Sequence, residues 1–492
     1  MKVLLINPPS YFKQYQYKRT PDVLPLGVLY VAKALLDAGH KVKFLDIFAE
    51  DLPLDTVIRR LQECQNERFD MVGITAMSVQ YAYVKWLSKQ IKVIFGNIPI
   101  VVGGALAIFS HDVLLNNTHV DITVTGEGEK TILDLASNMP LKNIRGIAYK
   151  KNGKITVNPP ADLVKNLDSI GYPAYELLPM GIYRKNMQFE MEIQDKNGKL
   201  KKEKFYYFCI SGGRGCPFNC NFCSRCFPGL RLRSVDNIIE EIKFFQRHYS
   251  FNSVMFFDEL ALIGKKRILE LAEKMKPLHL YWTANSRAEY LNKEILKKLK
   301  DSGCYQISFG IESGSQRILD AMNKKQKIEV AQKTLKAVID AGLKPNVQMI
   351  FGYPGENEES LRETYKFFKD IPVNVGFAIL TPLPGSKLYD DCIKRGFIPN
   401  EDKYLTALET GFSTLHLNLT DWTNNEFLRK REQLAININD NTIKLKYGIL
   451  KWSFYKFGSM FKQKISSLLT TAIKKIFYKL YKLFSKASVV KK

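Results

Sequence analysis

Residues 216–223 read Cys216-Pro-Phe-Asn-Cys220-Asn-Phe-Cys223 and follow an apolar segment, 205–210, with the pattern of a buried strand. Three thiolates at this spacing can hold three irons of a four-iron, four-sulfur cluster, leaving the fourth iron without a cysteine from the motif. A structural zinc site is the alternative, because Cys226 could supply a fourth thiolate. Cys226 follows Cys223 closely and no histidine lies nearby, so the spacing favours the cluster.

The cysteine motif stands at the beginning of a repeating pattern of strands and helices. Further strands are expected at 253–257, 281–284, 306–310, 347–350 and 376–380, with helices at 234–249, 265–275, 293–302, 328–341 and 358–369. Six such units predict a partial (β/α)6 barrel of the TIM type over residues 205–400. Active sites of these barrels lie at the carboxyl ends of the strands, which is where the motif falls.

The first 150 residues predict a second parallel sheet. Strands are expected at 3–6, 42–45, 71–75, 100–102 and 121–124, and helices at 26–38, 54–64, 81–95 and 130–138. This alternation predicts a doubly wound α/β domain, Rossmann-like or flavodoxin-like, over residues 1–150. Residues 144–158 predict a hairpin with Asn152-Gly153 at its turn. The segment 151–204 is interpreted as a linker whose charged part, 195–204, is a solvated loop.

Glycine, proline and small polar residues gather at the expected carboxyl ends of the N-terminal strands. The loops are Asn7-Pro8-Pro9, Thr75-Ala76-Met77-Ser78, Gly103-Gly104 and Gly126-Glu127-Gly128-Glu129. Glycine lets the backbone approach a flat or phosphorylated ligand, although any one of these loops could be only a tight turn. Four such loops on one edge favour a ligand-binding edge.

Further motifs lie at or just beyond the expected strand ends of the barrel. They are Ile210-Ser211, Phe256-Phe257-Asp258-Glu259, Asn285-Ser286-Arg287, Phe309-Gly310-Ile311-Glu312-Ser313-Gly314, Gly352-Tyr353-Pro354-Gly355 and Thr381-Pro382-Leu383-Pro384-Gly385. With the cysteine spacing and Phe222 before the third cysteine, this order resembles the radical S-adenosylmethionine superfamily. The resemblance implies that the open iron chelates S-adenosylmethionine and that one electron cleaves it, giving a 5′-deoxyadenosyl radical that removes hydrogen from the substrate.

The same resemblance implies roles for six side chains around S-adenosylmethionine. Asp258 and Glu259 would approach its amino group, Ser286 and Arg287 its carboxylate, and Glu312 with Ser313 its ribose or amino group. A zwitterionic ligand needs a carboxylate and a guanidinium near its two charged ends. An internal salt bridge to Glu289 or Glu312 is the alternative for Arg287.

The N-terminal motifs are similar to the cobalamin-binding domain that precedes many radical S-adenosylmethionine enzymes. The residues implied to line cobalamin are Asn7, Pro8, Pro9, Leu26, Gly27, Thr75, Ala76, Gly103, Gly104, Gly126, Glu127 and Gly128. The sequence contains no D-x-H-x-x-G motif, so no histidine is expected on the cobalt. His40 is interpreted as a structural residue at a helix end, and His111 and His119 as residues of surface loops.

The two resemblances cover about residues 1–400 and together imply a cobalamin-dependent radical S-adenosylmethionine enzyme. The commonest reaction of that group is methylation of an unactivated carbon, here expected on a lipid-like or other small molecule. Anaerobic oxidative cyclisation or rearrangement with the same cofactors is one alternative, and a non-catalytic cobalamin or iron-sulfur sensor is another. The expected partner is an electron donor such as flavodoxin or ferredoxin.

Composition agrees with a globular enzyme. The 492 residues are 46% hydrophobic and 25% charged, which argues against a mainly disordered or collagen-like chain. Eight cysteines are too few for a disulfide framework, and the N-terminus lacks the pattern of a secretory signal. No apolar run approaches the ~18 residues of a spanning helix, so a cytoplasmic enzyme is expected.

Charge is concentrated at the C-terminus. Residues 441–492 contain 13 lysines and no acidic residue, out of a net charge of +24 for the whole chain. After a helical extension at 401–440, apolar residues recur at helical spacing over 465–484 with lysines between them. Such a basic amphipathic helix predicts contact with the inner face of an anionic membrane. Packing against the barrel is the alternative, and no nucleic acid is expected because the lysines alternate with apolar residues.

Overall fold

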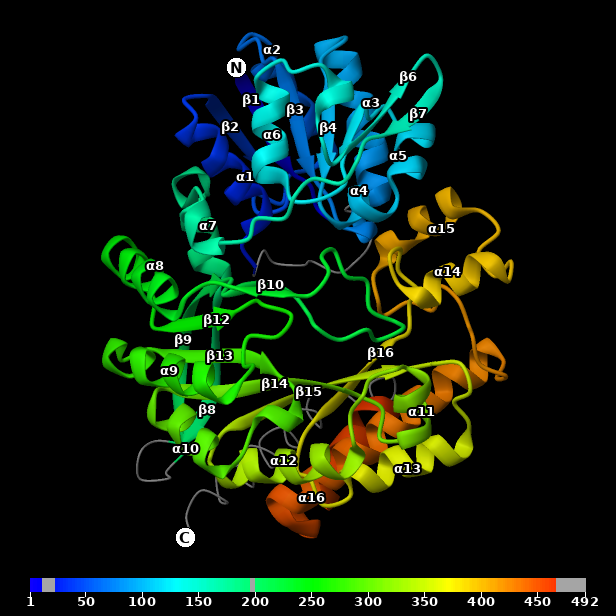
Figure 1. Ribbon diagram of the computed structural model, residues 1–492. Helices are drawn as coiled ribbons and strands as arrows, with labels where there is room; N and C mark the ends of the chain where they lie inside the picture. Colours follow the sequence, from blue (N-terminus) through cyan, green and yellow to red (C-terminus); the bar gives the residue numbers. More distant parts are fainter. Residues whose placement is uncertain (11–22, 195–199, 466–492) are drawn as a thin grey trace.

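The computed structural model describes residues 1–10, 23–194 and 200–465. These residues form two α/β bodies, each built on a seven-stranded sheet, followed by a helical C-terminal part. The N-terminal body, blue to cyan in Figure 1, lies above the green to yellow barrel body. The predicted fold class is therefore confirmed: a doubly wound domain is joined to a partial barrel.

The N-terminal sheet has the order β2-β1-β3-β4-β5-β6-β7. Its strands are β1 (Lys2–Asn7), β2 (Lys41–Asp46), β3 (Met71–Thr75), β4 (Ile100–Gly103), β5 (Ile122–Val124), β6 (Ile147–Lys151) and β7 (Lys154–Val157). The first five are parallel in the flavodoxin-like order, whose ligand position lies between β1 and β3. The last two form the hairpin predicted from Asn152-Gly153 and continue the sheet antiparallel.

Helices cover both faces of this sheet because its strands are apolar on both sides. Val3 and Leu5 share a core with α1 (Leu26–Asp37) and α6 (Gly128–Ala136). Leu4 and Ile6 point to the other face, where the helices are α2 (Leu54–Gln65), α3 (Tyr81–Phe95), α4 (Ala105–Phe109) and α5 (His111–Asn117).

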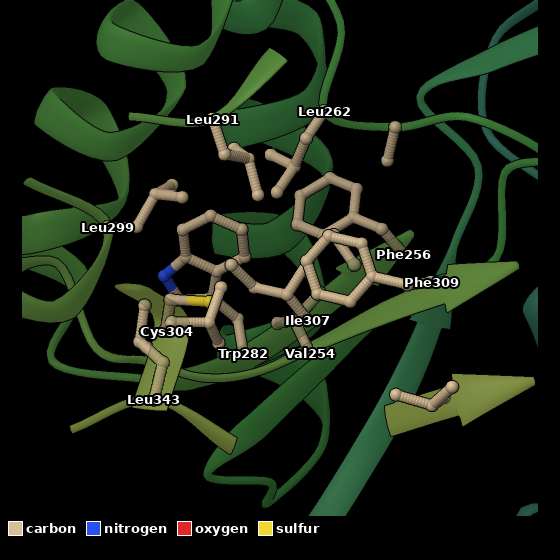
Figure 2. Packing of buried hydrophobic residues seen from close by; sticks show 14 of the residues in the cluster. Val254, Phe256, Leu262, Trp282, Leu291, Leu299, Cys304, Ile307, Phe309 and Leu343 are labelled. Atoms are coloured by element: carbon tan, nitrogen blue, oxygen red, sulfur yellow. The ribbon is translucent and has the colours of Figure 1, made fainter. Parts of the chain in front are cut away.

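The barrel sheet contains the six predicted parallel strands. They are β9 (Leu200–Ile210), β12 (Ser253–Phe256), β13 (Tyr281–Ser286), β14 (Cys304–Glu312), β15 (Lys344–Phe351) and β16 (Val375–Ile379). The helices are α8 (Val235–His248), α9 (Lys265–Met275), α10 (Lys293–Asp301), α11 (Gln316–Ala321), α12 (Ile328–Asp340) and α13 (Glu358–Phe368). Figure 2 shows Trp282 packed among Phe256, Phe309 and Leu299, and its indole donates a hydrogen bond to the Ser302 carbonyl at 3.0 Å. This core fixes the strand ends that carry the site.

The segment interpreted as a linker is more ordered than the sequence suggested. It contains α7 (Met180–Asn186) and β8 (Gln188–Gln194), and β8 pairs antiparallel with β9 at the edge of the barrel sheet. Residues 200–204, expected to lie in a solvated loop, extend β9. The register places Glu190 opposite Lys204 and Glu192 opposite Lys202, and such cross-strand charge pairs let these charged residues form exposed paired strands.

The C-terminal residues form α14 (Lys387–Lys394), α15 (Glu401–Ala407) and α16 (Asn424–Ile465). In Figure 1, α14 and α15 lie at the side of the molecule between the two bodies, and α16 runs along the barrel. Thr442 on α16 donates to the Val373 carbonyl at 2.6 Å, so the helix continues past residue 441, where the tail was expected to begin. Its helical path breaks at Gly448, whose φ is 82°. The apolar pattern at 466–484 lies outside the described residues.

No helix among the described residues has the length and apolar character needed to cross a bilayer.

Candidate active site

The cysteine motif lies in a loop closed by a short hairpin, which the sequence did not predict. Its strands are β10 (Gly213–Gly215) and β11 (Leu230–Leu232), antiparallel to one another, so the hairpin brackets residues 216–229. Gly215 has a φ of 84°, and a Cβ there would lie 2.4 Å from the Gly229 carbonyl oxygen. Glycine is thus required at position 215, where the two ends of the loop come into close contact.

The structure brings the three predicted cluster cysteines together. Burial raises the pKa of Cys223 to about 12, with further contributions from the charges of Glu259, Cys220 and Cys216. The pKa of Cys220 is also raised, mainly by burial, and Cys216 adds to the effect. Burial and Glu259 raise the pKa of Cys226 to about 11, and no other cysteine contributes to that shift. Charges on Cys216 and Cys220 thus contribute to the pKa of Cys223, whereas no cysteine contributes to that of Cys226.

The donor set fits an iron-sulfur cluster. Among the described residues, no three His, Cys, Asp or Glu side chains are arranged to hold one metal ion. A four-iron cluster makes a different demand, since each cysteine binds its own iron and the thiols need not converge on one point. Burial raises the pKa values of Cys220 and Cys223, so binding of iron to these two thiols must release their protons.

Asp258, expected near the amino group of S-adenosylmethionine, is bound to the chain that leads into the motif. Its carboxylate accepts hydrogen bonds from the amides of Gly213 at 2.6 Å and Gly212 at 3.0 Å, and from the Ser211 hydroxyl at 3.2 Å. Burial raises its pKa, and these bonds oppose the rise. The neighbouring Glu259 is exposed at the surface of this region, although surrounding atoms desolvate its carboxyl enough to raise its pKa. Glu259 is thus the acid of this pair that remains accessible.

Arg287 lies beneath the cysteine loop. Its guanidinium stacks 3.8 Å from the centre of the Phe218 ring and donates to the carbonyls of Lys324 at 2.9 Å and Lys325 at 2.8 Å. It also forms an ion pair with Glu289, which is the internal salt bridge considered as its alternative role. Arg287 therefore supports the loop from below in this structure.

Glu312 and Lys324 form a buried ion pair at the end of β14. The Lys324 ammonium lies 3.1 Å from Glu312 Oε1, and Glu312 has a φ of 68°, unusual for a residue other than glycine. A Cβ on Gly310 would lie 2.2 Å from the same oxygen, so the glycine makes room for the pair. Lys324 carries no motif that sequence reasoning could have used. Both charges act on the pKa of Cys220, which Lys324 lowers and Glu312 raises, although burial is the largest cause of its shift.

The two predicted serines are held by backbone groups. Ser286 donates to the carbonyls of Leu262 at 3.2 Å and Arg287 at 3.1 Å, and Ser313 accepts from the Ser315 amide at 3.2 Å. Phe222 packs beside the cluster of apolar residues formed by α11, α14 and neighbouring segments. These residues sit at the carboxyl edge of the barrel, as predicted.

The carboxyl edge of the N-terminal sheet has open space at its glycines. A Cβ on Gly27, Gly103 or Gly126 would meet no atom within 4 Å. Gly104, by contrast, has a φ of 91° and approaches the Ala76 carbonyl so closely that a Cβ would lie 2.6 Å from its oxygen. Three open glycines on one edge fit the approach of a large flat ligand such as cobalamin.

The other predicted residues of this edge are partly engaged with the protein. Asn7 donates to Asp46 at 2.8 Å, and Asp46 accepts from the Tyr183 hydroxyl at 2.7 Å. The Pro8 carbonyl accepts from Gln80, and Pro9 lies at the start of the loop after β1. Leu26 opens α1, Thr75 ends β3 and Gly128 opens α6.

Two histidines lie away from this edge or outside a loop. His40 lies 3.0 Å from the Met1 amino group at the opposite edge of the sheet, which agrees with a structural role. His111 begins α5 and does not lie in a surface loop.

Glu127, expected to line cobalamin, binds the hairpin of the barrel body. Its two oxygens accept hydrogen bonds from Arg214 at 2.6 Å, Arg231 at 2.9 Å and the Val164 amide at 2.6 Å. Burial opposes ionisation of Glu127, but these bonds outweigh burial and lower its pKa. Glu129 binds the second terminal nitrogen of Arg214 at 2.5 Å. The motif at residues 126–129 could be recognised in the sequence, but the sequence could not indicate that its glutamates bind two arginines.

A second contact joins the two bodies on the side of α14 and α15. The Ser224 hydroxyl donates to the Pro384 carbonyl at 2.6 Å, and the next residue, Gly385, touches the Phe109 ring so closely that a Cβ would lie 2.4 Å from it. Asp402 on α15 binds Lys85 at 2.6 Å and the Tyr81 hydroxyl on α3. The carboxyl edges of both sheets therefore face the cysteine loop.

Comparison with known proteins gives the same division of the chain. The family description "Radical SAM superfamily" matches residues 210–368, and "B12 binding domain" matches residues 17–136. An uncharacterized methyltransferase of Pyrococcus horikoshii, PH0819, is 32% identical over 421 residues, which cover 82% of this chain and 86% of that protein. An anaerobic magnesium-protoporphyrin IX monomethyl ester cyclase of Rubrivivax gelatinosus is 28% identical, and the match covers 77% of this chain and 68% of that protein.

A solved structure has the same fold. The radical S-adenosylmethionine methyltransferase TsrM from Kitasatospora setae, with tryptophan substrate and an S-adenosylmethionine analogue bound, has a TM-score of 0.65 at 17% identity. The match covers 80% of this chain and 76% of TsrM. With both domains matched and a relative of this identity over most of its length, the chain belongs to the cobalamin-dependent radical S-adenosylmethionine enzymes, whose cofactors are a four-iron, four-sulfur cluster, S-adenosylmethionine and cobalamin.

Proposed function

We propose that this enzyme transfers a methyl group to an unactivated carbon atom of a small organic molecule. The observation that carries the proposal is the bond between the two edges, in which Glu127 holds the hairpin that brackets the cysteine loop. Groups bound at the two edges would share one substrate space. The methyltransferase names of PH0819 and TsrM support this reaction over others.

The residues at the barrel edge have separate tasks in this proposal. The cluster with S-adenosylmethionine supplies a hydrogen-abstracting radical, and cobalamin supplies the methyl group. Cys216, Cys220 and Cys223 would lose their protons to hold iron. Glu259, the accessible acid, would bind the amino group of S-adenosylmethionine, while Asp258 positions the backbone before Cys216. Glu312 and Lys324 would face its polar groups with one charge of each sign.

The test uses S-adenosylmethionine with a deuterated methyl group. Reduced, reconstituted enzyme is incubated with a metabolite extract from a host that lacks the gene, without oxygen. A product that carries the deuterated methyl group, formed together with 5′-deoxyadenosine, is the expected result. Formation of neither compound would contradict an enzyme and favour the sensor.

Oxidative cyclisation or rearrangement is the second candidate, and the 28% identity to the cyclase favours keeping it. The same experiment separates the two reactions, because a cyclised or rearranged product gains no deuterium while S-adenosylmethionine is still cleaved. The electron needed for cleavage would come from a small donor such as flavodoxin or ferredoxin, in agreement with a cytoplasmic enzyme.

We further propose a lipid-like substrate, reached from the inner face of a membrane. The support is the excess of lysine in residues 441–492. Each lysine near an anionic surface contributes about 1 kcal/mol, and salt screens the attraction. We expect the full chain to sediment with anionic vesicles at low salt and a chain ending at Tyr447 to remain in solution. That end point precedes the break at Gly448 and keeps Thr442 bonded to the barrel. Equal sedimentation of both chains would remove the argument for a lipid.

A further inference from the structure

Four charged side chains join the N-terminal edge to the cysteine loop, and we refer to Glu127, Glu129, Arg214 and Arg231 as the clasp. Arg214 and Arg231 are directly opposite one another in the β10–β11 hairpin. Glu127 lies between them and accepts a hydrogen bond from each, while Glu129 takes the other terminal nitrogen of Arg214. The arginine side chains are 15% exposed, and that of Glu127 is 3% exposed. The clasp is therefore a shielded network of charges.

Each half of the clasp adjoins a different cofactor site. On the barrel side, β10 ends at Gly215, immediately before Cys216, so Arg214 lies two residues from the first cluster cysteine. On the N-terminal side, Glu127 follows Gly126, one of the glycines with open space at the edge. A displacement of either partner is transmitted to both sites, because few covalent bonds separate each partner from its site.

The chemistry of the clasp makes its geometry stringent. A carboxylate between two guanidinium groups can be satisfied only when both arginines keep their positions, because breaking a buried pair leaves a charge without compensation. Arg214 also stacks over the Tyr30 ring of α1, with 5.3 Å between the guanidinium carbon and the ring centre. These contacts consequently fix both the distance and the orientation of the hairpin relative to the N-terminal body.

We propose that Glu127 and Arg214 are positioning residues that fix the cluster loop relative to the cobalamin edge. The proposal rests on the cofactor sites assigned above and assigns the two residues no contact with substrate. Asp402, Tyr81 and Lys85 join the two bodies elsewhere, so loss of the clasp leaves the bodies attached and changes the alignment of the sites.

The test compares Glu127→Gln, Arg214→Gln and the double variant with wild-type enzyme. Glu127→Gln keeps the side-chain size and one acceptor oxygen but removes the charge. Holoenzyme with a reduced cluster and cob(II)alamin is examined by electron paramagnetic resonance, in which the cluster speeds the spin relaxation of cobalt according to their separation. We expect both single variants to change this relaxation at unchanged iron and cobalamin content. The double variant should add little, because the residues act as one unit.

Hydrogen exchange of the amides of residues 213–215 and 230–232 gives a second readout that needs no cobalamin. We expect exchange to rise by about tenfold or more in Glu127→Gln, because the hairpin opens more often. Glu67→Gln is the matched control, since Glu67 is also a carboxylate between two cations, Lys2 and Lys43, but lies within one body. Asp402→Asn removes a bond between the bodies outside the clasp. Neither control should change exchange in the hairpin.

The outcomes are distinct. Unchanged relaxation in loaded clasp variants overturns the proposal, even if the hairpin exchanges faster. Unchanged exchange in Glu127→Gln overturns it independently of any cofactor. Failure of wild-type enzyme to bind cobalamin would contradict the cofactor assignment, and hydrogen exchange would still decide whether the clasp holds the loop. If Glu127→Gln does not fold, Glu129→Gln replaces it, because it removes only the charge that Glu129 offers to Arg214. This variant must then change spin relaxation and hydrogen exchange in the same direction, by smaller amounts.

Discussion

Glu127 and Glu356 occupy comparable positions in the two sheets, but their pKa values shift in opposite directions. Glu127 follows β5 of the N-terminal sheet, Glu356 follows β15 of the barrel, and each is 5% exposed. Burial opposes ionisation of both. Hydrogen bonds from two arginines lower the pKa of Glu127, whereas Glu356 accepts from the Gly352 amide at 2.6 Å and its pKa is raised to about 7. Burial dominates the pKa of Glu356, whereas at Glu127 the bonds to two arginines outweigh burial.

The acidic side chains at the two carboxyl edges bind different kinds of partner. In the N-terminal sheet, Glu127 and Glu129 bind another part of the protein, and the glycines leave open space. In the barrel, Asp258 binds backbone amides and Glu312 binds a buried lysine within the same body. Acids at one edge join the two bodies, and acids at the other shape one site. The predictions below test this division.

The largest expected effect is loss of iron when the three cysteines are changed together. In Cys216→Ala/Cys220→Ala/Cys223→Ala, no thiolate of the predicted cluster motif remains, so anaerobic reconstitution should leave no bound cluster. Cobalamin content should stay the same if the two edges bind their cofactors separately. Iron and cobalt analysis of the same sample measures both. Cys226→Ala is the control and should retain iron, and a triple variant with wild-type iron content would refute the cluster site.

The second effect concerns the pH dependence of stability through Glu356. Its pKa is raised from 4.5 to about 7, so the folded state binds the proton more tightly than the unfolded state. Its contribution is therefore present below pH 4.5 and is lost as pH rises towards 7. The loss amounts to about 3 kcal/mol, and it is complete above pH 7. Glu356→Gln should lie within about 1 kcal/mol of wild type at pH 5 and be clearly more stable at pH 8.

Denaturant unfolding at pH 5, 6, 7 and 8 measures this difference. Glu358→Gln is the control, because Glu358 lies two residues away with its side chain 58% exposed. That variant should give a profile parallel to wild type. If Glu356→Gln were also parallel to wild type, the two edges would not differ in the way described.

The third effect is smaller and concerns the space around Glu312. Gly310→Ala would place a methyl group 2.2 Å from Glu312 Oε1 and must displace the carboxylate or Lys324. We expect a loss of about 2 kcal/mol in the free energy of unfolding and weaker binding of S-adenosylmethionine by calorimetry. Gly376→Ala, in β16 of the same sheet, meets no atom within 4 Å and should change neither. Equal behaviour of the two variants would show that Glu312 is not confined by the glycine.

The positions of the parallel strands and main helices of the two sheets could be predicted because hydrophobic periodicity is local, whereas α7, β8, β10 and β11 were missed. The cysteine loop and the edge glycines were also recognisable, since their residues are close in sequence. The residues that bind the acidic side chains of the site, however, could not be predicted. Arg214 and Arg231 lie on strands of three residues, too short for a periodic signal, and meet Glu127 only after the two bodies pack. Lys324 reaches Glu312 through a bulge in the pairing of β14 with β15, which no residue pattern indicates.

The smallest expected effect tests whether the open N-terminal edge is the cobalamin site. Gly126→Leu would fill space in which a Cβ meets no atom within 4 Å, so the free energy of unfolding should change by less than about 0.5 kcal/mol. A ligand lying over this edge would lose contact, and we expect its affinity to fall about tenfold, equivalent to about 1.4 kcal/mol. Equilibrium dialysis with hydroxocobalamin measures the affinity, and iron content should not change. Gly376→Leu is the control at an equally open glycine of the barrel and should leave cobalamin affinity unaltered. Unchanged affinity in Gly126→Leu would mean that the space beside Gly126 is not occupied by cobalamin, so that the N-terminal edge would serve at this point only to hold the hairpin through Glu127.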